Sequence, residues 1–88
     1  MNTKVYLVEI EHYDANGNYT SSEIQCAFTS GADAEAFVKS LAEEWSQSGA
    51  FTLEGQIDGY ARLDSNDLLH YDNIVITVTD TTLFYGRI

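Results

Sequence analysis

The sequence predicts an α+β domain in which one amphipathic helix packs on one face of an antiparallel sheet of about five strands, in the order β-β-α-β-β-β. Three observations predict this fold. Two alternating runs near the amino terminus are joined by an Asn-Gly turn, one later run has helical periodicity, and β-rich runs follow it. A chain of 88 residues is expected to form a single domain over residues 1–88, with one modest core.

A β-hairpin is predicted first. Residues 4–13 and 19–28 each alternate apolar and polar side chains, as half-buried strands do. Between them, Asn16, Gly17 and Asn18 tolerate positive φ, which indicates a three-residue turn.

Matching the apolar faces of these two runs fixes the predicted register. It places Tyr6 opposite Phe28, Val8 opposite Cys26, and Ile10 opposite Ile24. The same register places Glu11 opposite Glu23 and Glu9 opposite Gln25 on the outer face. Because like charges directly across a ladder destabilise a sheet by up to about 1 kcal/mol, the pair of Glu11 and Glu23 is expected to carry a cost.

One helix is predicted after Ser30, which precedes Asp33 as the first residue of a capping box. The apolar stripe of this helix has helical spacing and consists of Ala34, Phe37, Val38, Leu41 and Trp45. Gly49 is placed to end the helix in the left-handed conformation.

The remaining strands are predicted from shorter runs. About three strands are expected after the helix: residues 50–53 look like a short strand and 57–63 alternate, 74–79 is the strong β run, and a last strand runs from Leu83 to Arg87 after a turn at 80–82. Gly59 is interpreted as a bend or bulge within a strand. Residues 68–71 are too few to classify.

The composition describes a folded and strongly anionic protein. The net charge is −10, whereas 44% of the residues are hydrophobic and 12% are aromatic, which distinguishes the chain from disordered acidic tails. This charge disfavours nucleic acid and anionic membranes as direct partners and favours a basic protein surface. Glu9 and Glu11 interrupt the first apolar run before it could serve as a signal peptide, so a cytoplasmic protein is expected.

No motif points to catalysis, a cofactor or a metal, and we therefore predict a protein that is not an enzyme. Asp14 begins a segment that resembles the start of a calcium loop, but Tyr19 and Gln25 stand where that loop needs Gly and Glu. A hairpin turn is the preferred interpretation of this segment. His12 and His70, with a single cysteine, fit none of the recurrent zinc spacings.

The distribution of the acids is more informative than their number. The helix dipole favours Asp33 and Glu35 near the helix start but disfavours Glu43 and Glu44 near its end. Tyrosines near the hairpin tip add the residue type common in interface hot spots. The predicted partner-binding residues are Glu9, Glu11, Tyr13, Tyr19, Glu23, Glu43 and Glu44. Two other interpretations stay open: a charged surface kept for solubility, and tyrosines placed by their β-propensity.

In size, acidity, lack of cofactor motifs and compact α+β pattern, the whole chain resembles the small phage-encoded anti-CRISPR and anti-restriction inhibitors, several of which mimic DNA. The resemblance concerns these overall properties, and it assigns no site residue in this chain. It implies an inhibitor that acts in the host cytoplasm, as a monomer or homodimer, by blocking a basic nucleic-acid-handling surface. The alternative function is an assembly module that self-associates through an exposed strand edge, for instance the last predicted strand.

Overall fold

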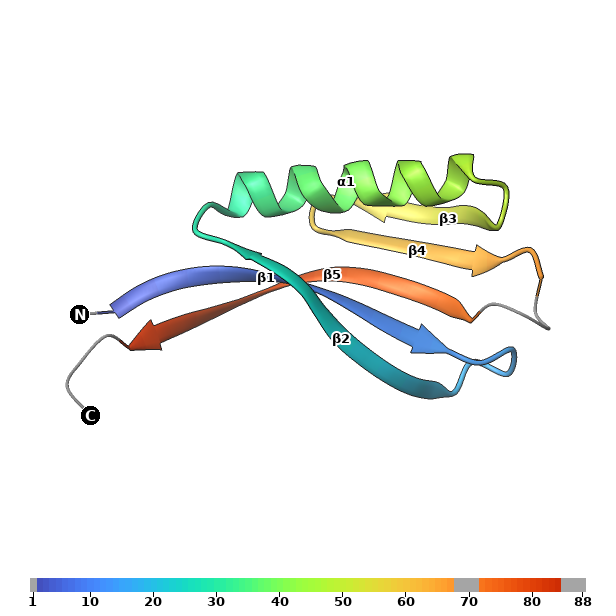
Figure 1. The fold of residues 1–88 in the computed structure, drawn as a ribbon, viewed down its shortest axis with the longest axis horizontal. Helices are drawn as coiled ribbons and strands as arrows, with labels where there is room; N and C mark the ends of the chain where they lie inside the picture. Colours follow the sequence, from blue (N-terminus) through green and yellow to red (C-terminus); the bar gives the residue numbers. More distant parts are fainter. Residues whose placement is uncertain (1, 68–71, 85–88) are drawn as a thin grey trace.

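The computed structural model describes residues 2–67 and 72–84. They form one five-stranded antiparallel sheet in the order β2-β1-β5-β4-β3, with a single helix along one side (Figure 1). The elements, in chain order, are β1 (Asn2–Tyr13), β2 (Tyr19–Phe28), α1 (Gly31–Gln47), β3 (Phe51–Ile57), β4 (Tyr60–Ser65) and β5 (Asn73–Phe84). The predicted fold class and element order are therefore confirmed.

The centre of the sheet is the long pairing of β1 with β5. The two strands pair along their whole length, from Asn2 opposite Phe84 to Tyr13 opposite Asn73, without a shift of register. The predicted turn at 80–82 is wrong, because β1 offers ladder partners as far as Phe84. Lys4 Nζ lies 3.0 Å from Asp80 Oδ2 across this pairing. Of the last predicted strand, 83 and 84 belong to β5, and residues 85–87, like 68–71, lie outside the described residues.

Helix α1 begins and ends as predicted. The Ser30 side chain accepts a hydrogen bond from the Asp33 backbone N–H at 3.3 Å, and Gly49 follows the helix with a φ of 85°. Of the predicted stripe, Ala34 and Val38 are buried, and Phe37, Leu41 and Trp45 are partly buried against the core. Ala42 is also buried, one turn after Val38.

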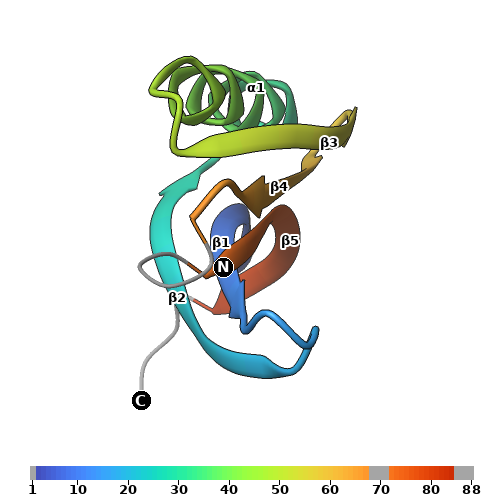
Figure 2. The ribbon, with the colours of Figure 1, turned by 90° about the vertical axis from the view of Figure 1, so that its right-hand side faces the viewer.

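The core lies between α1 and one face of the sheet, which we call the closed face. Its strand residues are Val8, Ile10, Ala61, Leu63, Ile74 and Ile76, all of them buried. Figure 2 shows α1 lying along this side of the sheet, close to β3. Cys26 packs against the same core, and partial burial raises the pKa of its thiol.

The hairpin register departs from the prediction midway along β2. Tyr6 pairs with Phe28 and Val8 with Cys26, as expected, but Glu9 then pairs with Ile24. Gln25 is therefore an extra residue on β2, a β-bulge that exchanges the two faces of the strand beyond it. The predicted pairs of Ile10 with Ile24, Glu11 with Glu23, and Glu9 with Gln25 are all wrong for this reason. Glu23 pairs with Ile10 and Glu11 pairs with Ser22.

A second shift of register follows near the hairpin tip. His12 pairs with Ser21 and Tyr13 with Tyr19, so Thr20 is a second extra residue on β2. The predicted turn over 16–18 therefore lies one residue too late, and Ala15, Asn16 and Gly17 form it between Asp14 and Asn18. Gly17 has a φ of 84°, which explains why glycine stands there.

Strand β3 contains a bulge of the same kind. Leu53 pairs with Leu63 and Gly55 with Arg62, so Glu54 is the extra residue. Gly59 lies in the two-residue turn between β3 and β4, where it has a φ of 74°, and not inside a strand as predicted. All three bulges thus lie on β2 and β3, the two edge strands, whereas the pairings of β1, β5 and β4 keep one register.

Candidate functional site: the open face of the sheet

Within residues 2–67 and 72–84, no helix packs on the sheet face opposite α1, and we call this face the open face. Its residues follow from the register, because neighbours along a strand point to opposite faces and paired residues share a face. The open-face residues that matter below are Glu9, Glu11, Tyr13, Tyr19, Ile24, Ile57, Tyr60, Arg62, Asp64, Val75 and Thr77.

The large hydrophobic side chains that stand exposed among the described residues all lie on the open face. Their exposed fractions are 73% for Ile57, 60% for Ile24, 57% for Tyr19 and 36% for Tyr60. Single exposed apolar side chains are ordinary on protein surfaces, but a concentration of them on one face marks an interaction surface. The open face is therefore the best candidate for a functional site.

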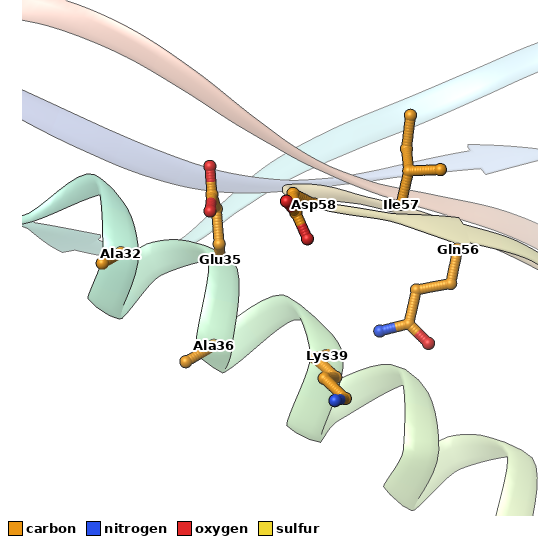
Figure 3. A pocket seen from close by; sticks show the side chains of 7 residues that line it. All are labelled: Ala32, Glu35, Ala36, Lys39, Gln56, Ile57 and Asp58. Atoms are coloured by element: carbon orange, nitrogen blue, oxygen red, sulfur yellow. The ribbon is translucent and has the colours of Figure 1, made fainter.

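Bulges are the reason that both isoleucines face outward. Leu53 lies on the closed face, so strict alternation along β3 would place Ile57 there too. The extra residue Glu54 reverses this alternation, and Ile57 pairs with Tyr60 on the open face. On β2, Gln25 does the same for Ile24. Figure 3 shows the result on β3, with Ile57 pointing away from the helix and Gln56 extending toward it.

One row of paired residues crosses all five strands of the open face. It runs from Ile24 through Glu9, Thr77 and Tyr60 to Ile57. Four spacings between neighbouring strands make this row about 19 Å long. The row therefore has an exposed aliphatic side chain at each end and a half-buried carboxylate, that of Glu9, between them.

The carboxylates at the centre of the open face are not neutralised by the described cations. Glu9 and Glu11 form no ion pair within residues 2–67 and 72–84. The nearby cation is Arg62, but its Nε lies 3.1 Å from Asp64 Oδ1, and the hydrogen bond to Asp64 raises the pKa of Arg62. The centre of the open face consequently keeps its negative charge available to a partner.

Two tyrosines continue the open face toward the hairpin tip. The rings of Tyr13 and Tyr19 meet edge to face with centroids 6.0 Å apart, and Tyr19 Oη donates a hydrogen bond to Ser22 Oγ at 3.0 Å. Burial raises the pKa of Tyr13, and the charge and hydrogen bond of the neighbouring Glu11 carboxylate raise it further. The Tyr13 phenol therefore stays protonated well above neutral pH.

The structure does not bring all predicted partner-binding residues together. Glu9, Glu11, Tyr13 and Tyr19 share the open face. Glu23 lies on the opposite side of β2, where its Oε1 is 3.5 Å from Nε2 of His12. His12 Nδ1 also lies 3.9 Å from Asp72 Oδ2.

Glu43 and Glu44 are exposed on α1, the helix that packs against the closed face. They do not lie on the open face. These two glutamates and Glu23 therefore belong to other surfaces of the molecule.

Sequence reasoning missed the two exposed isoleucines, because it assigned both of them to the apolar inner face. For Ile57 a signal existed in Gly55, since a glycine inside a strand pattern often marks a bulge, and the bulge lies at the preceding residue. For Ile24 no local signal existed, because nothing in the residues around Gln25 distinguishes a bulge from a regular strand.

A second concave region lies between α1 and the end of β3. It has a volume of about 450 Å³ and is lined by Ala32, Glu35, Ala36, Lys39, Gln56, Ile57 and Asp58 (Figure 3). Its charged side chains are Glu35, Lys39 and Asp58, and no Ser, Thr or Cys is among the residues that line it. No group of three or more His, Cys, Asp or Glu residues within the described ranges is arranged to hold a metal ion.

No protein-family model, curated protein or solved structure matches this chain. In the part of the chain that the structure describes, no helix is long and apolar enough to span a membrane.

Proposed function

We propose that this protein is a non-enzymatic inhibitor that binds a basic, nucleic-acid-handling surface of a partner protein and blocks it. The observation that carries the proposal is the open face, where the uncompensated carboxylates of Glu9 and Glu11 stand among exposed apolar side chains. An interface of this kind combines apolar contact area with charge that selects and orients the partner.

Charge decides which kind of partner is favoured. The chain carries a net charge of −10, and two of its four basic residues, Lys4 and Arg62, are engaged with Asp80 and Asp64. Direct binding to nucleic acid would lack the release of counterions that supplies most non-specific affinity. A cationic protein surface gains from the same charge, and electrostatic attraction speeds its association.

The spacing of the acids supports a surface that normally grips a phosphate backbone. Glu9 and Glu11 follow each other on one face of β1, so they lie about 6.6 to 6.8 Å apart along the strand. This spacing is close to the advance along the helix axis of two phosphates of one DNA strand, at about 3.4 Å each. The resemblance to anti-CRISPR and anti-restriction inhibitors stays a prediction, with which this spacing agrees.

The proposal is tested by capture and competition. The protein is immobilised and exposed to a nuclease-treated host lysate at low salt, and the bound proteins are eluted with a salt gradient. We expect a captured protein that elutes as the salt rises, because screening weakens interactions between exposed charges. Its binding to a labelled DNA or RNA duplex should then be lost when the inhibitor is added, in a mobility-shift assay.

The chain offers a matched control for this test. The double substitution of Glu9 and Glu11 by Lys should weaken capture, whereas the same change at Glu43 and Glu44 alters the net charge equally on a different layer and should preserve most of it. A captured protein that keeps its nucleic-acid binding in the presence of the inhibitor would refute the proposal. Equal losses for both double variants would show that net charge alone, and not the open face, determines capture.

The alternative of self-association through a strand edge stays a prediction. Bulges interrupt β2 and β3 and hinder the addition of a further strand there, whereas residues 79–84 of β5 pair only with β1 among the described residues and form a regular edge.

A further inference from the structure

The pattern of the open face also specifies the partner. The row from Ile24 to Ile57 is apolar at both ends and carries one carboxylate between them, that of Glu9 on the strand next to Ile24. A complementary surface has aliphatic side chains at both ends of a strip about 19 Å long and a cation between them. A uniformly basic partner would leave both exposed isoleucines without an apolar contact.

A second copy of this chain fits the open face poorly. Two open faces packed together would place four carboxylates, Glu9 and Glu11 of each copy, in one interface, and none of them has an ion-pair partner among the described residues. Each copy also carries a net charge of −10. The resulting repulsion opposes such a dimer, so charge complementarity favours a cationic partner over a second copy.

The side chains beside the carboxylates favour arginine over lysine as the central cation. Tyr60 is separated from Glu9 by one strand, and Tyr13 lies next to Glu11 on the same face of β1. Guanidinium groups form two parallel hydrogen bonds with a carboxylate and stack on aromatic rings, whereas the lysine ammonium is a compact, strongly hydrated charge.

We infer that the open face accepts an arginine-centred segment of the partner protein with aliphatic residues at both of its ends. This inference rests on the proposed function, which it makes specific. The aliphatic ends contact Ile24 and Ile57 at the two sheet edges. The central arginines bind Glu9 and Glu11 beside the tyrosine rings.

Three synthetic peptides of 13 residues probe the inference, since about 13 residues of helix span 19 Å at about 1.5 Å per residue. The first has leucines at both ends and three arginines in its middle, separated by alanines. The second has the same composition with the leucines in the middle and the arginines at the ends. The third replaces the arginines of the first with lysines. Binding to the intact protein is measured by titration calorimetry at low salt.

We expect the arginine-centred peptide to bind most tightly, and the inverted peptide to bind about tenfold more weakly, because its charges and apolar side chains face the wrong parts of the row. The lysine peptide should fall between them. Both double variants Glu9→Gln with Glu11→Gln and Ile24→Ser with Ile57→Ser should weaken binding of the first peptide by about tenfold. Glu43→Gln with Glu44→Gln is the matched control and should leave that affinity unchanged.

Equal affinity for the first two peptides would overturn the inference, as would unchanged affinity in either open-face variant. A circular-dichroism melt of each variant separates loss of binding from loss of fold. A dimer of the intact protein in sedimentation that Ile24→Ser with Ile57→Ser abolishes would identify a second copy as the occupant, which also overturns it. If the peptides fail while capture and competition succeed, the inference is wrong and the proposed function stands. If capture also fails, both are wrong.

Discussion

The two faces of this sheet are built from the same strands and serve different ends. On β1, Val8 and Ile10 point to the closed face and are buried, whereas Glu9 and Glu11 point to the open face between them. The closed face carries the apolar core beneath α1, with polar side chains such as His12 toward the end of the strand. The open face mixes carboxylates with exposed isoleucine and tyrosine, a mixture that contributes little to folding. The comparison shows that the buried core and the exposed apolar side chains occupy opposite sides of one layer.

The largest expected effect compares the same substitution on both faces. Ile76→Ala on the closed face removes a fully buried side chain beneath α1 and should lower the free energy of unfolding by about 2 to 5 kcal/mol. Ile57→Ala on the open face should lower it by less than about 1 kcal/mol, because the side chain is already in water. Urea denaturation of both variants measures the difference, and equal losses would show that the open face is covered in solution.

A smaller effect is expected at the start of α1, the helix that covers the closed face. Ser30→Ala removes the acceptor for the Asp33 backbone N–H and should cost about 0.5 to 2 kcal/mol in unfolding free energy. Thermal denaturation measures it. Ser30→Asp restores an acceptor at the same position and should recover most of the loss, whereas failure of this rescue would assign the effect to something other than capping.

The hairpin tip, where the open face ends, should respond to pH through Asp14. Backbone N–H hydrogen bonds, first from Asn18 and then from Asn16, outweigh partial burial and lower the pKa of Asp14 below its ordinary value of 3.8. A lowered folded-state pKa means that the stabilisation is present above the unfolded value and is lost as pH falls through the folded value.

Wild type should therefore exceed Asp14→Asn in stability near neutral pH, and the difference should shrink in acid. Urea denaturation of both proteins at several pH values measures it. A difference that does not change with pH would contradict the assignment.

The smallest expected effect is a change in the pKa of Tyr13 on the open face. Glu11→Gln removes a charge that raises the pKa of Tyr13, so this pKa should fall. It should stay above 10.0, because burial is the larger cause. The ring resonances of Tyr13 in a nuclear magnetic resonance titration measure the shift. Glu43→Gln lies on the other layer and should leave the pKa of Tyr13 unchanged.

Periodicity and capping were enough to predict the elements of this fold. Ser30 and the apolar stripe of the helix act through contacts a few residues apart, so α1 could be delimited from the sequence. The course of β5 could not, because its continuation past Asp80 depends on pairing with Lys4 at the far end of the chain. Short-range turn signals at 80–82 do not report such a distant partner.

The candidate site was predicted only in part, for a related reason. Glu9, Glu11 and Tyr13 lie on β1, which pairs with β5 without a shift, so alternation placed them correctly with respect to one another. Glu23 lies on β2 beyond the bulge at Gln25, and alternation therefore placed it on the wrong face. A bulge depends on how two strands meet, and a pattern read along one strand does not contain it.

Residues 21–24 lie between the two bulges of β2, and each of them faces the side of the sheet opposite to the one that strict alternation predicts. Cys26 before the segment and Tyr19 beyond it keep the faces that alternation predicts. A one-residue insertion or deletion at a sheet edge can thus replace the chemistry that the open face displays. The uninterrupted ladder of β1, β5 and β4 and the core beneath it are untouched by such a change. Changes in edge-strand length can therefore alter which side chains the open face displays while the core stays nearly unchanged.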